Sequence, residues 1–184
     1  GENTLEGDHI SLAKYPEIKE KAIVVNGLSK SHAMTGWRIG YVVAHRVIME
    51  DITAVHLYNT ICASIPSQYA AIEALTTQLH VPKEMNQAYI QRRDYIYKRL
   101  TDMGLEVSKP TGAFYIFPSI RKYEEDSFKF ATDLLESVHL AVVPGRSFSE
   151  YGEGHIRLSF ACSMEELTEA ADRLEKYIKI LDMK

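Results

Sequence analysis

The 184-residue chain has few of the residues that build disulfide scaffolds, metal ribbons or membrane spans. Its two cysteines, Cys62 and Cys162, are far apart and form no CxxC pair, which excludes a zinc ribbon and a disulfide framework. We expect both thiols to be buried and reduced. The longest apolar runs are as short as residues 23–25, whereas a membrane helix needs roughly 18 consecutive apolar residues. No basic leader with an apolar core is visible either, so we expect a cytoplasmic protein.

An excess of positive charge is also absent. The chain has 21 Lys and Arg residues against 25 Asp and Glu residues, with a net charge of −4, which argues against a nucleic-acid surface. The motifs HExxH and GxxxxGK and the serine nucleophile elbow are missing. Zinc proteolysis, nucleotide hydrolysis and α/β-hydrolase chemistry therefore have no support, and we predict no metal site. With 46% hydrophobic and 25% charged residues, the composition is typical of a soluble globular protein.

Hydrophobic periodicity predicts an α/β chain. The best-marked helix starts after Ser163, because Ser163 and Glu166 have the spacing of a capping box and apolar residues then recur every three or four positions. In the second predicted strand, Arg38 faces away from the bulky apolar residues. The predicted strands span 21–26, 37–44, 105–107, 113–117, 140–143 and 156–160, and the predicted helices span 46–57, about 82–103 and 127–138, with another starting at 64–66. A change of pattern near 79–84 predicts a boundary between a domain of residues 1–80 and one of residues 81–184.

The segment 26–41 carries the most specific chemistry. Lys30 directly follows a buried strand, and Arg38 comes eight residues later between Gly36 and Gly40. A lysine at such a strand end can be partly desolvated, which lowers the pKa of its amine and lets the amine form an imine with an aldehyde. Arg38 offers a planar, charged fork that suits phosphate. The two residues together indicate an aldehyde that also carries a phosphate, as pyridoxal 5′-phosphate (PLP) does.

Lys30 and the string Gly-Trp-Arg-Ile-Gly at 36–40 closely resemble the Schiff-base lysine motif of class I/II aminotransferases. This is the aspartate aminotransferase family of PLP enzymes with fold type I. The resemblance implies that Lys30 is the catalytic lysine that binds the cofactor and that Arg38 binds its phosphate. It also implies the end of the large-domain sheet in residues 1–80 and the α/β small domain in residues 81–184. One departure is Gly27, because many members carry a serine there whose hydroxyl contacts the phosphate.

A second motif lies in segment 151–161 and contains Arg157. It resembles the C-terminal segment of the same family, whose arginine pairs with the α-carboxylate of the substrate. The predicted strand places Ile156, Leu158 and Phe160 on one face and Arg157 on the other, away from the packed core. A guanidinium fork suits a planar carboxylate. The resemblance therefore implies that Arg157 binds substrate, and the alternative is a structural ion pair with a nearby acidic residue.

Four further features of the sequence receive no catalytic role. Segments 109–115 and 143–148 look like small-domain segments of the family, and segment 58–61 falls where relatives approach the cofactor of the neighbouring subunit. His32 lies inside the strongest motif, but we do not expect it to be the base, because the lysine does that work in this chemistry.

The resemblance implies an aminotransferase that moves an amino group between an amino acid and a 2-oxo acid, in a homodimer of chains about twice this long. The groups that hold the cofactor ring, above all an aspartate on its pyridinium nitrogen, would then lie outside this sequence. We therefore expect a fragment that is oligomeric or aggregation-prone and inactive by itself. A PLP-dependent β-lyase, a PLP-sensing regulatory domain and a structural fragment that binds nothing remain open as alternatives.

Overall fold

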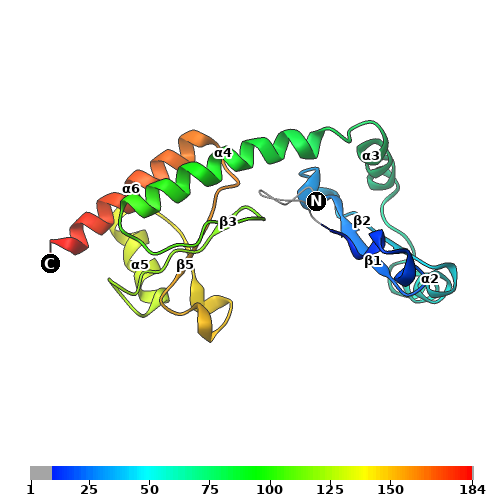
Figure 1. Ribbon diagram of the computed structural model, residues 1–184, viewed down its shortest axis with the longest axis horizontal. Coiled ribbons are helices and arrows are strands. Elements are labelled where there is room, and N and C mark those ends of the chain that lie inside the picture. The colour runs from blue at the N-terminus through cyan, green and yellow to red at the C-terminus, as the bar shows by residue number, and fades with distance from the viewer. Residues whose placement is uncertain (1–9, 184) are drawn as a thin grey trace. The chain divides into compact units, whose positions relative to one another are not determined.

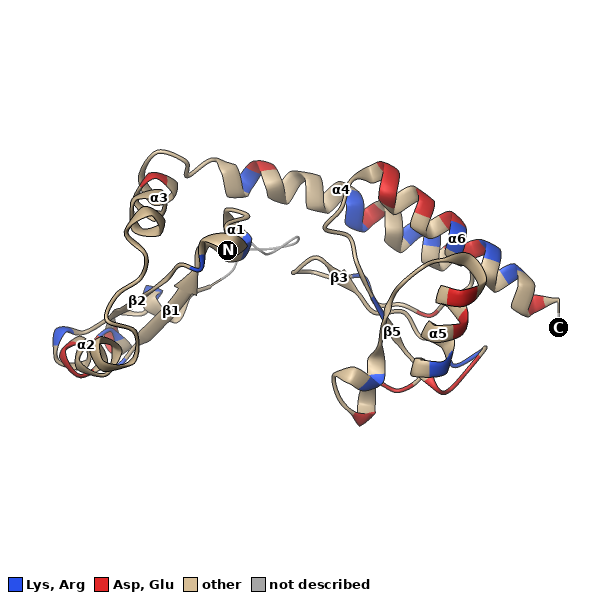
Figure 2. Cartoon of the chain, turned by 180° about the vertical axis from the view of Figure 1, so that it is seen from behind, with Lys and Arg blue, Asp and Glu red and all other residues tan. Residues whose placement is uncertain are grey.

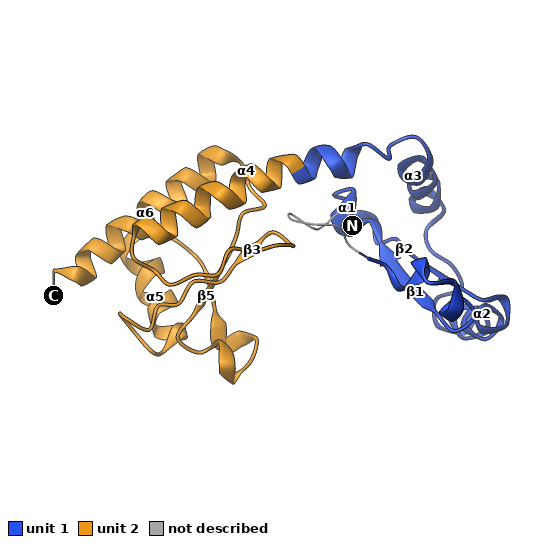
Figure 3. Cartoon of the chain, in the orientation of Figure 1, with its two compact units in different colours: residues 1–86 blue, residues 87–184 orange. Residues whose placement is uncertain are grey.

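The computed structural model describes residues 10–183 (Figure 1). The chain divides into two compact units, the first unit of residues 1–86 and the second unit of residues 87–184 (Figure 3). The division falls inside α4 (Val81–Asp102), a few residues beyond the change of pattern seen in the sequence. The assignment of residues 1–80 and 81–184 to the large and small domains of the family stays a prediction.

The first unit is built on two antiparallel strands, β1 (Ile23–Gly27) and β2 (Gly40–Ala44). Their register pairs Gly27 with Gly40. A Cβ atom added to Gly40 would lie 2.8 Å from the carbonyl oxygen of Asn26, so this approach of the two backbones requires glycine. The helices of this unit are α1 (Leu28–Ser31), α2 (Arg46–Thr60) and α3 (Ile65–Thr76), with 3₁₀ turns at Leu12–Lys14, Pro16–Ile18 and Thr35–Trp37.

The prediction of a strand over 37–44 is wrong for its first three residues, because β2 starts only at Gly40. The N–H groups of Trp37 and Arg38 bond back to the carbonyl oxygens of Met34 and Thr35, which forms a tight 3₁₀ turn. Arg38 then adopts the left-handed conformation, with φ at 50° and ψ at 47°. Arg38 therefore lies in a turn and has no strand face, contrary to the alternation expected from the sequence.

The second unit contains a three-stranded antiparallel sheet in the order β3–β5–β4, with strands Tyr115–Ile116, Ile156–Ser159 and Val143–Pro144. Around it lie α5 (Ser127–Val138), α6 (Met164–Asp182) and the C-terminal part of α4 (Figure 1). Short 3₁₀ turns follow β4 at Gly145–Ser147 and Glu150–Gly152. Buried apolar side chains of the sheet meet those of the three helices in one core: Ile96, Leu100, Ile116, Phe130, Leu134, Ile156, Leu158, Leu167, Leu174 and Ile178.

The predicted helices of the second unit are confirmed, but its strands are shorter than expected: only Tyr115 and Ile116 of the strand predicted over 113–117, and only Val143 of the one over 140–143, lie in strands. The helix over 127–138 is confirmed, and the strand over 156–160 is confirmed as β5 apart from its last residue. The strand predicted over 105–107 is wrong. A backbone hydrogen bond from the Ser119 N–H to the carbonyl oxygen of Glu106 joins this segment to residue 119. A single such bond does not form the regular pairing of a strand.

The surface of the second unit mixes acidic and basic residues. Figure 2 shows both signs of charge interspersed along α4 and α6. Arg99 on α4 connects the two helices, because its Nη2 atom lies 2.8 Å from a carboxylate oxygen of Asp172 and 3.1 Å from one of Glu175. None of the helices within residues 10–183 is long and apolar enough to cross a membrane.

The two units differ sharply in how much apolar surface they bury. The buried hydrophobic cluster of the first unit consists of Leu28, Met34 and Ala74. Large apolar side chains of the same unit are open to solvent, among them Tyr58 at 91% exposure and Ile61 at 74%. A contiguous exposed apolar surface favours association. The oligomerisation or aggregation expected from the sequence stays a prediction.

The expectation that both thiols are buried is wrong for Cys62, which is exposed just after α2, whereas Cys162 is partly buried. α2 has no buried residue, so Cys62 lies beside a helix that is itself open to solvent.

The capping box of α6 forms as predicted. The Oγ atom of Ser163 accepts a hydrogen bond from the Glu166 N–H (3.1 Å), and a Glu166 carboxylate oxygen accepts one from the Ser163 N–H (2.9 Å). Hydrogen bonds to its charged form hold the pKa of Glu166 below its ordinary value.

We predict that Ser163→Ala lowers the free energy of unfolding of the second unit by about 1 kcal/mol, because the N-terminal N–H groups of α6 lose their side-chain acceptor. Urea denaturation followed by circular dichroism measures the change. The matched control is Lys176→Ala, an exposed position in the middle of the same helix. Equal midpoints for the two variants would contradict the prediction.

Candidate active site

Lys30 lies on α1, the short helix that directly follows β1, as the sequence predicts. The helix is anchored by Leu28, which is 1% exposed and packs with Met34 and Ala74. The side chain of Lys30 itself is exposed. The partial burial of the amine that the sequence led us to expect is therefore not seen among residues 10–183.

Thr35 makes hydrogen bonds both to the residue before Lys30 and to Arg38. Its Oγ1 atom donates a hydrogen bond to the carbonyl oxygen of Ser29, the residue before Lys30, at 2.8 Å. Its own carbonyl oxygen accepts a hydrogen bond from Nη1 of Arg38 at 3.0 Å. One threonine thus ties the helix that carries Lys30 to the guanidinium of Arg38, within a loop of residues 28–40.

The same loop contains two strained backbone positions. Ala33 and Arg38 both adopt positive φ angles, 52° and 50°, which non-glycine residues rarely do. Such conformations persist only where the surroundings hold them, and they gather at functional sites. The hydrogen bonds of Thr35 supply part of that hold.

Gly27 occupies the position where many aminotransferases carry a serine, and the structure has room for a larger side chain there. A Cβ atom added to Gly27 would lie 3.7 Å from the Ile39 carbonyl oxygen and 3.9 Å from the Gly40 Cα atom. Both are ordinary contacts, and the φ angle of −152° is extended. A serine would therefore fit at this position.

His32 ends α1 and is partly buried. Its Nδ1 atom lies 3.0 Å from the Oγ atom of Ser31. The histidine thus contacts the buried side of the loop, whereas Lys30 is on the exposed side.

Arg157 lies on β5 in the second unit. The alternation predicted from the sequence is confirmed, because Ile156, Leu158 and Phe160 are buried while Arg157 is only partly buried on the other face. No Asp or Glu among residues 10–183 forms an ion pair with Arg157. The alternative of a structural ion pair therefore finds no support in the described part of the chain.

A pocket of about 260 Å³ adjoins Arg157 within the second unit. It is mainly apolar, with Ser159 and Cys162 adding polar atoms to its wall. Burial, helped by the negative charge of Glu166, raises the pKa of the Cys162 thiol. The thiol is therefore held in its neutral form and is a poor nucleophile here.

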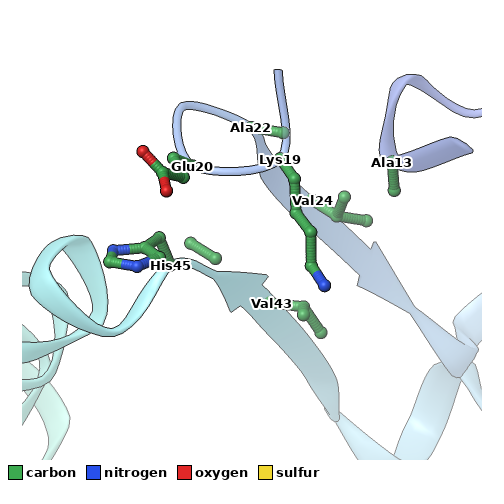
Figure 4. Close-up of a pocket in the computed structure, with 8 residues that line it drawn as sticks. Ala13, Lys19, Glu20, Ala22, Val24, Val43 and His45 are labelled. Carbon is green, nitrogen blue, oxygen red and sulfur yellow. The ribbon is translucent and has the colours of Figure 1, made fainter. Parts of the chain in front are cut away.

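A second pocket, of about 370 Å³, lies on the strands of the first unit and contains none of the predicted site residues. Figure 4 shows Lys19 extending over Val24 and Val43, with Glu20 and His45 together on one side.

The structure thus describes two groups of candidate residues, each inside its own unit: Lys30 and Arg38 in the loop of residues 28–40, and Arg157 on β5. An amine that can condense with an aldehyde and a guanidinium that can bind phosphate occur in one short, hydrogen-bonded loop.

Residues 2–174 match the family described as aminotransferase class I and II. The chain belongs to this family. It is 52% identical over 177 residues to a probable N-acetyl-LL-diaminopimelate aminotransferase of Bacillus subtilis, covering 96% of this chain and 44% of that protein. It is 43% identical over 173 residues to an aspartate aminotransferase of Pyrococcus abyssi, covering 93% and 44%.

A solved structure of an aromatic aminotransferase from Pyrococcus horikoshii superposes on this chain with a TM-score of 0.88 at 41% identity. The match covers 97% of this chain and 48% of the aminotransferase. The expected fold, PLP-dependent transferase fold type I, is confirmed by this likeness, with the chain spanning about half the length of its relatives. The family is PLP-dependent, and the chemistry of Lys30 and Arg38 fits the aldehyde and the phosphate of that cofactor.

Sequence reasoning missed three residues that the structure brings to these groups. Thr35 lies inside the aminotransferase motif, but nothing in its position predicts a bond back to Ser29. The rings of Tyr115 and Phe148 contact Arg157, and both belong to segments that resembled the family without an assigned role.

We predict that Thr35→Val weakens the loop of residues 28–40 by about 1 kcal/mol, because the Ser29 carbonyl oxygen loses its side-chain donor. Amide hydrogen exchange of residues 28–40 should become about fivefold faster. The matched control is Thr53→Val, which removes a hydroxyl-to-carbonyl bond on α2. Unchanged exchange in the loop, or the same change in the control, would show that Thr35 does not hold it.

Proposed function

We propose that this chain is part of a PLP-dependent aminotransferase that moves an amino group between an amino acid and a 2-oxo acid. The observation that carries the proposal is the loop of residues 28–40 in a chain of this family, where Thr35 ties the Lys30 helix to Arg38. Lys30 is the catalytic residue and binds the cofactor, Arg38 binds its phosphate, and Arg157 binds the substrate carboxylate.

The bound cofactor supplies an aldehyde carbon and a ring that accepts electron density from the substrate. Lys30 would hold the cofactor through Nζ, and as a free amine the same group would take a proton from the substrate Cα atom. Arg38 uses one N–H donor on Thr35, so its remaining donors are available to phosphate oxygens. Arg157 donates hydrogen bonds from its planar fork to the α-carboxylate, which fixes the direction of the reacting Cα bond.

The substrate class and the setting of the enzyme are parts of the same proposal. Relatives are named for aspartate, for aromatic amino acids and for N-acetyl-LL-diaminopimelate, which supports amino acids and 2-oxo acids as substrates. The working enzyme is a cytoplasmic homodimer, with residues 1–80 in its large domain and residues 81–184 in its small domain. The exposed apolar side chains of the first unit support such a partner surface, and the 184 residues alone are inactive.

We predict that borohydride reduction of the chain in the presence of PLP labels Lys30 ahead of the other lysines, because an amine beside a phosphate-binding arginine keeps the cofactor near it. Peptide mapping by mass spectrometry locates the label. Lys30→Ala should lose it, whereas the matched control Lys21→Ala, an exposed lysine ahead of β1, should keep it.

Labelling spread over the surface lysines, equal in the chain and in Lys30→Ala, would contradict the assignment of Lys30.

A further inference from the structure

Two aromatic rings contact the guanidinium of Arg157. Its Cζ atom lies 4.3 Å from the centre of the Tyr115 ring and 4.5 Å from the centre of the Phe148 ring. Tyr115 comes from β3, which is hydrogen-bonded to the Arg157 strand, and Phe148 follows β4 on the other side of that strand. We call Tyr115 and Phe148 the aromatic pair.

The aromatic pair stabilises the charge of Arg157 without using its hydrogen-bond donors. A cation is attracted to the face of a ring by the ring quadrupole, whereas an acidic partner would occupy N–H groups of the fork. Arg157 has no acidic partner among residues 10–183, so the N–H groups stay available to an incoming carboxylate. Phe148 is 50% exposed, which leaves this side of the guanidinium within reach of solvent and ligand.

Each ring of the aromatic pair has further aromatic contacts. Phe117 meets Phe148 edge-on at 6.1 Å, and His155 stacks on Phe117 at 5.3 Å with an interplanar angle of 9°. Tyr115 contacts Phe114 at 4.6 Å. The aromatic pair is therefore part of a supported layer of rings.

The loop that presents Phe148 is closed by two glycines. A Cβ atom added to Gly145 would lie 2.0 Å from the Gly152 carbonyl oxygen, and one added to Gly152 would lie 2.2 Å from the Gly145 carbonyl oxygen. No side chain fits where the two backbones cross.

Two hydrogen bonds also join the same loop to the start of α5. The Arg146 N–H donates to Oγ of Ser127 at 3.2 Å, and the Ser127 N–H donates to Oε1 of Glu153 at 2.6 Å. The backbone of the loop that carries Phe148 is therefore held on both sides of this residue.

We propose that Tyr115 and Phe148 are positioning residues, which hold the Arg157 guanidinium in the orientation that receives the carboxylate of the substrate. The inference rests on the proposed function of Arg157. A flexible arginine loses rotamer freedom when it binds a ligand, and an arginine already held by two rings loses less. The rings also keep water from part of the guanidinium, which strengthens its attraction to a carboxylate.

The test uses the 184-residue chain with Tyr115→Leu, Phe148→Leu and the double variant. Tyr115→Phe keeps the ring and serves as the conservative rescue. Phe128→Leu removes an exposed ring on α5, at 59% exposure, and serves as the matched control. Phe148 is half exposed, so its replacement by leucine costs little packing, and the core residues of the second unit are untouched.

The first readout is the Nε–H signal of Arg157 in nuclear magnetic resonance spectra, which a nearby ring shifts. We expect the signal to move toward that of a free arginine in each leucine variant and to stay in place in Tyr115→Phe and Phe128→Leu. This pattern shows that each ring lies against the guanidinium in solution, and the binding constants below distinguish a positioning role from contact alone. A signal at the free-arginine position in the unsubstituted chain would overturn the inference.

The second readout is the dissociation constant for 2-oxoglutarate, followed on the same signal. We expect each leucine variant to bind about threefold more weakly and the double variant about tenfold more weakly, with Tyr115→Phe and Phe128→Leu unchanged. Arg157→Gln should no longer bind 2-oxoglutarate. Because this variant lacks the Arg157 signal, binding is followed on the signals of Tyr115 and Phe148.

The two possible failures are distinguishable. Loss of binding in Arg157→Gln with unchanged binding in the leucine variants would overturn the positioning role and leave the carboxylate role of Arg157 standing. Equal response to 2-oxoglutarate in Arg157→Gln and in the unsubstituted chain, including no response in either, would overturn the carboxylate role and the inference with it.

Discussion

The alternation of side chains along β5 is the constraint on which the second unit depends. Ile156, Leu158 and Phe160 are buried in the core, so the residues between them must lie on the opposite face. A slip of one residue in the register would bury Arg157 and expose all three apolar side chains. The hydrophobic core thus decides that the guanidinium lies on the outer face, where the aromatic pair can contact it.

In the first unit the close approach of Gly27 and Gly40 has a similar role. The pairing of these glycines joins the two ends of the loop that carries Lys30 and Arg38. Within the loop, Thr35 holds the Lys30 helix and Arg38 through hydrogen bonds. The core beneath this loop is small, so local hydrogen bonds and glycine contacts define the loop more than burial does.

Local patterns were predictable from the sequence, and contacts between distant segments were not. The capping box of Ser163 and Glu166 and the alternation around Arg157 are confirmed, because each depends on neighbours a few residues away. The strand assigned to Arg38 is wrong, because a 3₁₀ turn and a left-handed residue interrupt an apolar pattern that looks extended. The contacts of Arg157 with Tyr115 and Phe148 depend on strand pairing across the sheet, which no local motif encodes. The family was recognisable because its lysine motif is a continuous stretch of sequence. The hydrogen bond of Thr35 to Ser29 was not, because it forms only when that stretch folds back on itself.

We propose that this chain supplies the catalytic lysine and both arginines of an aminotransferase. The most direct test joins the chain to the part of the Bacillus subtilis relative that it does not match, and measures transfer of the amino group from amino acids to 2-oxoglutarate. The account predicts formation of glutamate and the matching 2-oxo acid, with activity abolished by Lys30→Ala and kept by Lys21→Ala. Equal activity with and without the Lys30 amine, or release of ammonia in place of a new amino acid, would contradict it.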